Sequence, residues 1–533
     1  MERNVITMAL SICLTLGFFS VVSAYLPAKT AGRTSKQLLV KAEPVTLTEV
    51  LDNVPPLPAE DTTTAPADSG DAVLPFWMES GPVEWVDAAP PGLKPSQFPL
   101  KIYKPLPAVS RAAFPSRFRP HADLLPMIEF WRNVYANYDL HHTLLHDAEN
   151  LNLVYGVLDL EGINQNLRSK IESIKKAELK AMLLRLDQGE KPVTAGEHLI
   201  AHLFENIHDR DKFKTAANQI RGQWGQRSRF EEGLIRSGRY LPTIEKIFEA
   251  QGVPKEISRL VFVESMFVPR ARSRVGAAGP WQFMPATARR HGLVINSTID
   301  ERHDPLIAAQ AAARLLRKDH HKLENWPLAI NAYNTGAGRM ERAAHRLHTR
   351  QIHVIIRHFE DRAYQFASRN FYPEFLAALE VVQNYPNYFG GIELEKPVPF
   401  DELKLKRPTS AYHLALKSGT DPEVLKDLNQ AYHPEAFRPG GVIPEGYVIR
   451  VPHRQKEIFA SLVDEIHTTE GPVKRYVVQR GDTLLRIADR HRTTLSDLKS
   501  FNGLIGHQIQ PGQVLKIPGA SRTVMLEEEG TGD

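Results

Sequence analysis

Proline is distributed unevenly along this chain, and its distribution limits where regular structure can form. Of the 38 prolines in 533 residues, 16 lie between 25 and 120, including the run Pro55-Pro56-Leu57-Pro58. Because proline lacks a backbone N–H and has a fixed φ, this stretch cannot hold helix or sheet for long and favours extended, polyproline-like chain. We therefore predict a flexible linker over 25–120 and a folded core that begins near His121.

The chain as a whole has the composition of an ordinary globular protein. Apolar residues make up 42% and charged residues 24%, which excludes a wholly disordered, collagenous or polytopic membrane protein. The length predicts about three domains. A net charge of +4 does not by itself indicate a nucleic-acid partner, and it is compatible with an anionic polymer as substrate. With Cys13 as the single cysteine, neither an intramolecular disulfide nor a thiolate zinc site can form.

The N-terminal segment has the pattern of a secretory signal peptide over 1–24. Arg3 precedes an uncharged, mostly apolar stretch that ends in Val22-Ser23-Ala24, a small-x-small cleavage pattern. The alternative is a retained anchor helix that would associate the protein with a membrane, since about 20 such residues can span a bilayer. Either interpretation predicts an exported protein.

Helical patterns begin at 121. Apolar residues recur at helical spacing over 124–138, 148–160 and 167–186, and Asp304-Pro305 has the cap and first-position residues of a helix start. We predict a helical lead-in over 121–235 and a mainly α domain over 236–390.

Two similar short units follow the helical region. Residues 474–519 show the order strand, helix, helix, strand, and 400–455 look like a diverged copy, because 420–429 parallels 494–502 and 444–452 parallels 510–518. We predict a small α+β (βααβ) fold for each unit, and a disordered acidic tail over 520–533.

Glu264 is the candidate catalytic acid. If 254–265 is helical, Glu264 continues the apolar stripe formed by Ile257, Leu260 and Val261. Burial there would raise its pKa, as a general acid near neutral pH requires. The alternative is a glutamate at a frayed helix end that reaches solvent.

Two further segments carry candidate ligand-binding residues. Around Trp281 and Gln282, two glycines would allow close approach of a ligand to the backbone, while the indole and the amide suit a sugar and its N-acetyl group. Tyr333 could hydrogen-bond a carboxylate or a sugar near the glycine-rich end of a helix. The alternatives are an ordinary turn and an interfacial tyrosine.

Together these segments resemble the lytic transglycosylases of bacterial cell-wall metabolism, most closely the membrane-bound lytic murein transglycosylase D type. The resemblance rests on Glu264-Ser265, then Gly279-x-x-Gln282-x-Met284-Pro285, then Ala332-Tyr333-Asn334-x-Gly336. It implies a mainly α, lysozyme-like catalytic domain in the periplasm or cell envelope of a Gram-negative bacterium, with peptidoglycan glycan strands as partner and no cofactor or metal. The implied substrate-binding residues are Ser265, Trp281, Gln282, Met284, Tyr333 and Asn334.

The implied chemistry needs one carboxylate. Glu264 would protonate the oxygen between N-acetylmuramic acid and N-acetylglucosamine and then accept a proton from the muramic C6 hydroxyl, which closes a 1,6-anhydro ring. The three segments contain no second acid, although a two-carboxylate glycosidase would need one. The alternatives are a hydrolytic muramidase on the same fold and a non-catalytic binding scaffold.

The chain departs from the family pattern at two places. Pro280 stands where leucine is usual, and the late Glu-Thr-Arg-x-Tyr segment appears as Ala367-Ser368-Arg369-Asn370-Phe371. The second departure leaves open which residue supports Glu264 from that side.

The C-terminal units resemble LysM, a peptidoglycan-binding module, strongly at 475–518 and weakly at 405–453. The expected glycan-facing residues are Gly481, Asp482, Thr483, Leu484, Asn502 and Gly503. The alternative is that Asp482 and Thr483 only cap a helix. Adjacent histidines at 141–142 and 320–321 are expected to diverge around a helix and to hold no metal.

Overall fold

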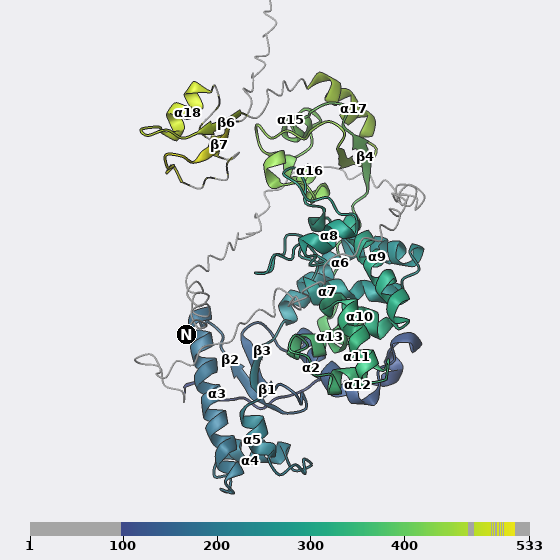
Figure 1. The fold of residues 1–533 in the computed structure, drawn as a ribbon, viewed down its shortest axis with the longest axis vertical. Coiled ribbons are helices and arrows are strands. Elements are labelled where there is room, and N and C mark those ends of the chain that lie inside the picture. Colours follow the sequence, from purple (N-terminus) through teal and green to yellow (C-terminus); the bar gives the residue numbers. More distant parts are fainter. Residues whose placement is uncertain are drawn as a thin grey trace, which may run out of the picture. The chain divides into compact units, whose positions relative to one another are not determined.

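The structure is a computed structural model that describes residues 97–466 and 474–517, apart from positions 492, 494, 496, 497, 500, 501, 503 and 505. The predicted signal peptide, most of the predicted linker, Gly503 and the acidic tail lie outside the described residues. Among the helices that are described, none combines the length and the apolar character needed to cross a bilayer. Figure 1 shows the elements in chain order.

The lead-in before 227 is an α+β unit rather than a helical one. Strands β1 (His142–Asp147), β2 (Val154–Asp159) and β3 (Ile220–Trp224) form an antiparallel sheet in the order β2-β1-β3 (Figure 1). Leu144 pairs with Val157 on one side and with Gln223 on the other. The prediction of helix over 148–160 was wrong, because 148–153 form a turn and the mostly apolar 154–159 are the buried strand β2, which periodicity alone does not distinguish from a buried helix.

Three helices accompany this sheet. They are α3 (Gln165–Asp187), α4 (Ala195–Leu203) and α5 (Lys212–Ala217), and side chains from all three share a core with β1 and β2. The helix expected over 167–186 is confirmed as α3, which Asn164 caps through its side chain.

The predicted linker ends earlier than position 120. Lys101 forms a backbone bridge with Val157, and the side chains of Phe114 and Phe118 are buried in the main core. The Phe118 ring meets Phe375 edge-on at 5.6 Å between centroids. The segment is irregular, as its prolines require, but aromatic side chains between the prolines fasten it to the core.

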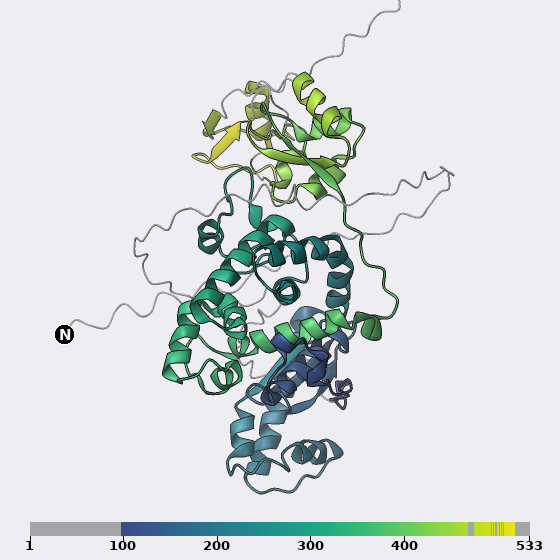
Figure 2. The same ribbon diagram turned by 90° about the vertical axis from the view of Figure 1, so that its right-hand side faces the viewer.

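The region from 227 to 390 is mainly α, as predicted, and its helices gather around one core (Figure 2). The central helix α13 (Phe366–Gln383) contacts α2 (Leu125–Ala136), α7 (Leu260–Glu264) and α10 (Trp326–Thr335). The remaining helices are α6 (Arg227–Ala250), α8 (Pro285–Arg290), α9 (Pro305–Leu323), α11 (Ala337–Arg346), α12 (Ile352–His358) and α14 (Tyr385–Phe389).

Helix α9 begins as the sequence predicted. Asp304 accepts hydrogen bonds from the backbone N–H groups of Leu306 and Ile307, and Pro305 takes the first helical position. All five alanines on α9 are fully buried, and these small side chains allow close approach of neighbouring helices.

The first repeat, residues 400–466, has the expected βααβ order and one further helix. Its elements are β4 (Phe400–Lys404), α15 (Ala411–Lys417), α16 (Pro422–Leu428), β5 (Val448–Pro452) and α17 (Lys456–Glu465). Phe459 of α17 is fully buried in the core of the unit, so the unit extends past the predicted end at 455.

The second repeat, residues 474–517, contains β6 (Lys474–Val477), α18 (Leu484–Arg490) and β7 (Val514–Ile517). One asparagine makes the same three hydrogen bonds in both repeats. The Asn429 amide donates to the backbone carbonyls of Leu425 and Arg450 and accepts from the Arg450 N–H. Asn502 does the same with Leu498 and Lys516, which supports the internal duplication.

Removal of the segment before His121 should destabilise the fold. We expect Phe118→Ala to lower the free energy of unfolding by about 3–5 kcal/mol, because its fully buried ring leaves a cavity against Phe375. Ile102→Ala is the control, since this side chain is 63% exposed. Thermal unfolding followed by circular dichroism measures both, and equal midpoints would show that the segment does not stabilise the core.

Candidate active site

Glu264 is the last residue of α7, and the chain turns sharply after it. Met266 and Phe267 both have left-handed backbone angles, with φ of 51° and 59°, and these end the helix. Ile257, Leu260 and Val261 are fully buried, as the apolar stripe predicted. Glu264 is itself only 3% exposed, so the interpretation as a frayed, solvated glutamate does not hold.

Burial determines the protonation state of Glu264. The loss of solvation raises its pKa well above the ordinary value for a glutamate. Three groups interact electrostatically with it, namely the buried Tyr135 of α2 and Glu374 of α13 and the partly buried Tyr333 of α10. Their own pKa values are also raised, first by desolvation and then by neighbouring charge. Glu264 is therefore an acid held in its protonated form by a desolvated surrounding.

The loop 276–285 is anchored beside Glu264. The Ser265 hydroxyl donates to the Pro280 carbonyl at 2.8 Å and joins the end of α7 to this loop. Gly279 has φ of 81°, and a Cβ there would lie 1.6 Å from the Arg302 carbonyl oxygen, so no other residue fits. Ser265 is thus a supporting residue for the loop.

Gln282 has the geometry of a ligand-binding amide. Its φ of 46° is left-handed, and its Nε2 donates to the Gly279 carbonyl at 2.7 Å. Its buried Oε1 has no hydrogen-bond partner among the described residues. A buried acceptor without a partner is costly, so it is available to an N–H or O–H of a substrate.

Trp281 does not have the predicted role. Its indole is fully buried, stacks on Phe248 at 5.3 Å between centroids, and donates to the Pro305 carbonyl at 3.2 Å. It is a core side chain that fixes the loop against α6 and α9, and it cannot present a face to a sugar. Met284 is half-buried at the N-cap of α8.

Tyr333 and Asn334 lie at the end of α10, next to the loop. The Tyr333 hydroxyl donates to the Trp281 carbonyl at 2.9 Å. The Asn334 Oδ1 accepts from the Ser368 hydroxyl at 3.1 Å. In this structure each of the two residues holds a neighbouring segment in place.

Sequence reasoning missed Glu374 and Tyr135. Glu374 lies on α13 directly after the altered segment 367–373 and is fully buried, and the Tyr135 hydroxyl interacts with its carboxyl. The available signal was a lone acid inside an apolar helical run, Phe371-Tyr372-Pro373-Glu374-Phe375. The second carboxyl of the site therefore comes from a fourth segment.

Two of the predicted glycan-facing residues in the second repeat have structural roles. Leu484 is buried, and Asn502 holds β7 as described above. Asp482 accepts from the Tyr476 hydroxyl, which lowers the pKa of its carboxyl, and Thr483 caps α18. Gly481 has φ of 89° in this turn.

Asp482 and Thr483 nevertheless line a hollow of about 510 Å³. Its other wall is formed by the segment 507–513, which sequence reasoning did not identify. The hollow offers polar side chains to a ligand, among them three glutamine amides.

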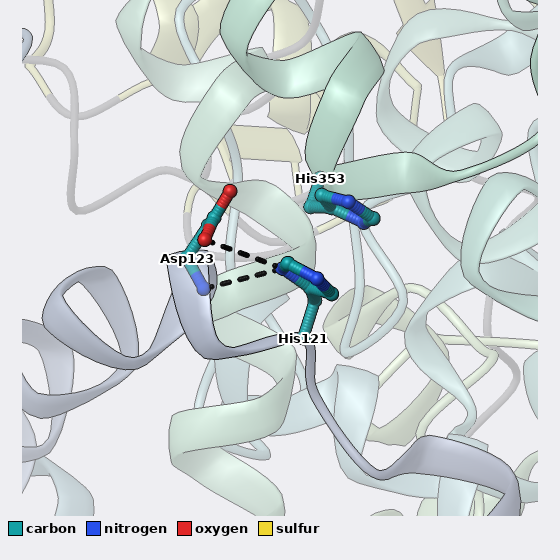
Figure 3. Close-up of side chains that lie close together, drawn as sticks. All are labelled: His121, Asp123 and His353. Carbon is teal, nitrogen blue, oxygen red and sulfur yellow. Dashed lines mark hydrogen bonds and ion pairs between the residues drawn. The ribbon is translucent and has the colours of Figure 1, made fainter.

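Two clusters of histidine and aspartate bring possible metal ligands together. His121 and His353 stack face to face at 3.7 Å between ring centroids, with 5° between their planes, beside Asp123 (Figure 3). A metal ion lies in the plane of each imidazole that binds it, and two parallel stacked rings cannot share one such ion. The geometry therefore disfavours a metal.

The expectation that His141 and His142 diverge around a helix was wrong. They lie at the start of β1, with ring centroids 4.0 Å apart, close to Asp159. The Lys101 ammonium already pairs with the Asp159 carboxylate at 2.6 Å and would compete with a cation.

Comparisons with known proteins agree with this geometry. Residues 243–356 match the family described as Transglycosylase SLT domain, and residues 476–518 match the LysM domain. The chain contains a transglycosylase SLT domain. Glu264, the loop 276–285 and Tyr333 lie inside the matched range of the SLT domain, whereas Tyr135 and Glu374 lie outside it.

Three relatives indicate how far the similarity extends. Membrane-bound lytic murein transglycosylase D of Escherichia coli K12 is 26% identical over 313 residues, 56% of this chain and 68% of that protein. Peptidoglycan transglycosylase gp16 of Escherichia phage T7 is 40% identical over 99 residues, 18% of this chain and 8% of that protein. A solved lytic transglycosylase Slt from Pseudomonas aeruginosa is 20% identical with a TM-score of 0.24, covering 42% of this chain and 33% of that one.

Glu374→Gln should leave the alkaline limit of activity where it is in the wild type. Burial raises the pKa of Glu374 well above its ordinary value and charge on Glu264 raises it further, whereas the raised pKa of Glu264 comes from burial. Since Glu264 must be protonated to act as an acid, activity falls as pH rises through its pKa, and Glu374 is still protonated at that point, so its replacement by a neutral amide removes no charge.

The measurement is the pH–rate profile on soluble glycan strands. Tyr135→Phe should likewise leave the alkaline limb in place, because loss of its hydrogen bond raises the pKa of Glu374 further. An alkaline limb that moves to lower pH in Glu374→Gln would show that Glu374 is charged when the enzyme acts.

Proposed function

We propose that this protein is a peptidoglycan lytic transglycosylase in which Glu264 is the single catalytic acid and base. The SLT domain and the homologous murein transglycosylases support the lyase activity, and the LysM domain supports peptidoglycan binding. The observation that carries the residue assignment is the burial of Glu264 at the end of α7, which the Ser265 hydroxyl joins to the loop that carries Gln282.

The same burial serves both halves of the reaction. A carboxyl with a raised pKa holds its proton near neutral pH and gives it to the glycosidic oxygen as the C1–O4 bond breaks. The resulting carboxylate is poorly solvated and therefore a strong base. It takes the proton of the muramic C6 hydroxyl while the C1–O6 bond forms, so protons balance and no water is consumed.

Within the loop, Gln282 is the residue best placed to bind a substrate amide. Its Oε1, which has no hydrogen-bond partner among the described residues, can accept from the N–H of an N-acetyl group. Ser265 and Tyr333 support the reaction indirectly, because their hydroxyls donate to the backbone carbonyls of Pro280 and Trp281 and so fix the loop.

The hydrolytic alternative is less well supported. A two-carboxylate hydrolase needs its second carboxylate beside the sugar, either as a nucleophile or to activate a water. Glu374, the second carboxyl near Glu264, is fully buried. The binding-scaffold alternative leaves the desolvated Glu264 and the Gln282 acceptor without a role.

Cell-envelope localisation follows from the substrate. The E. coli relative is membrane-bound by its name. We extend this to export of this chain to the periplasm, with the segment 1–24 as signal peptide or as membrane anchor.

Glu264→Gln should abolish product formation and leave the fold intact. The amide is nearly isosteric with the acid but cannot donate and retrieve a proton, and general acid–base catalysis alone is worth about 10²–10⁴-fold. The assay digests sacculi and detects 1,6-anhydro ends by mass spectrometry, which are about 18 Da lighter than reducing ends from hydrolysis.

Glu256→Gln is the matched control. This glutamate lies in the 3-10 helix Lys255–Arg259, which directly precedes α7, and it is partly exposed. It should keep full activity. Reducing ends without anhydro ends in the wild-type digest would establish a muramidase, and Glu264→Gln activity within about tenfold of wild type would remove Glu264 from the role.

A chain that ends after residue 466 should bind insoluble sacculi more weakly and still cleave short soluble strands. The second repeat has a core of its own, so its loss leaves the buried core of the catalytic domain untouched. A linked binding domain raises retention on a polymer by effective concentration, about 10²–10⁴-fold. Pelleting assays and soluble-strand turnover measure the two effects, and an equal loss of both would refute the anchoring role.

A further inference from the structure

The first repeat packs on the catalytic domain through the segment 296–304, which joins α8 to α9. Ile299 and Tyr432 form an antiparallel backbone bridge. The Asp300 N–H donates to the Ala431 carbonyl at 2.7 Å, and the His433 N–H donates to the Thr298 carbonyl at 3.1 Å. Backbone pairing of this kind fixes both the distance and the register between two segments.

Side chains reinforce the same contact. Arg450 of β5 donates to the Asp304 carboxylate at 2.5 Å, and both side chains are largely buried, 12% and 3% exposed. Arg270, six residues after Glu264, donates to the Tyr432 carbonyl at 2.9 Å. A buried ion pair with its hydrogen bonds in place gives a defined geometry. Removal of one partner is costly, because the other charge is then left buried and unpaired.

The contacted segment in turn holds the loop 276–285. Asp300 is 2% exposed and accepts from the Arg302 guanidinium at 2.9 and 2.8 Å. The remaining Arg302 nitrogen, Nη1, donates to the carbonyls of Gly276 and Phe283, each at 3.0 Å. One arginine therefore ties both ends of the loop that carries Gln282 to the segment on which the first repeat lies.

Helix α9 provides a second connection. Asp304 receives Arg450 on one carboxylate oxygen and caps α9 with the other. The first carbonyl of that helix, from Pro305, accepts from the Trp281 indole. The contact with the first repeat is thus connected to the loop 276–285 by two routes, one through the segment 296–304 and one through helix α9.

The turn that makes these contacts corresponds to a turn in the second repeat. Asn429 and Asn502 are equivalent by their three hydrogen bonds, so the 429–433 turn is the counterpart of the turn around 502, which the resemblance to LysM places at the glycan-facing edge. In the first repeat this turn is covered by the catalytic domain.

We propose that the first repeat acts as a clamp on the catalytic domain, with Arg450 as a positioning residue that keeps the loop 276–285 in its substrate-binding geometry. The proposal rests on the proposed function, because the loop matters only if Glu264 and Gln282 act on a glycan. The proposal gives the two repeats different roles, because the first repeat orders the catalytic site and the second binds the polymer.

The test compares Arg450→Met with Arg438→Met in the full chain. Arg438 lies in the same repeat, but its side chain is half-exposed and pairs with nearby Glu435 at 3.9 Å. Arg450→Met should lower kcat on soluble glycan strands by about tenfold or more, since small misplacement of binding groups costs this much. Sacculus binding should be unchanged, and Arg438→Met should match wild type in both assays.

Hydrogen exchange followed by mass spectrometry gives a readout independent of activity. In Arg450→Met, amides over 276–285 should exchange faster while those of α6 keep their protection. Arg450→Lys keeps the charge and should restore part of both properties. If Arg450→Met does not fold, Arg270→Met removes the contact with the Tyr432 carbonyl and should reproduce the exchange effect.

The outcomes separate this proposal from the proposed function. Absence of anhydro products from wild type would count against the proposed function alone, because the exchange measurement still reports on the clamp. Wild-type kcat and loop exchange in Arg450→Met would overturn the clamp, as would a loss of activity that follows the unfolded fraction.

Discussion

The desolvation of one carboxyl, that of Glu264, is the constraint on which the rest of the site depends. A glutamate at a helix end would normally reach water, and here the chain reversal at Met266 and Phe267 and the packing of α13 prevent this. Its pKa rises because the charged form is poorly solvated, and the same condition makes the carboxylate basic once it has lost the proton. A single group can then act in both steps, provided that its surroundings keep water out.

The side chains around Glu264 mainly form hydrogen bonds that fix the backbone of the neighbouring loop 276–285. Ser265 and Tyr333 donate to carbonyls of the loop 276–285, and Arg302 donates to two more. Trp281 anchors the same loop from inside the core. Such fixed supports keep a binding group like Gln282 in position without reorganisation when substrate arrives.

The two repeats show how one small fold can serve two purposes. The conserved element order and the shared asparagine hydrogen bonds define the same framework in both. In the first repeat the turn after α16 pairs with catalytic-domain backbone, whereas in the second Asp482 and Thr483 line a hollow. A fold tolerates such a change because its core is separate from the residues on its turns.

The sequence by itself determined the mainly α domain, the duplicated βααβ units and the candidate for the acid, because helical periodicity, the Asp304-Pro305 cap and the spacing of three motifs can be read along the chain. It misassigned 148–160, the end of the linker and the role of Trp281, because a buried strand, an aromatic anchor and a core indole are distinguished only by what packs on them. Tertiary structure alone brought Tyr135 and Glu374 to Glu264, since these residues lie far apart along the chain and meet only where α2, α7 and α13 pack together. Electrostatic interaction depends on distance in space, and that distance is decided by the fold.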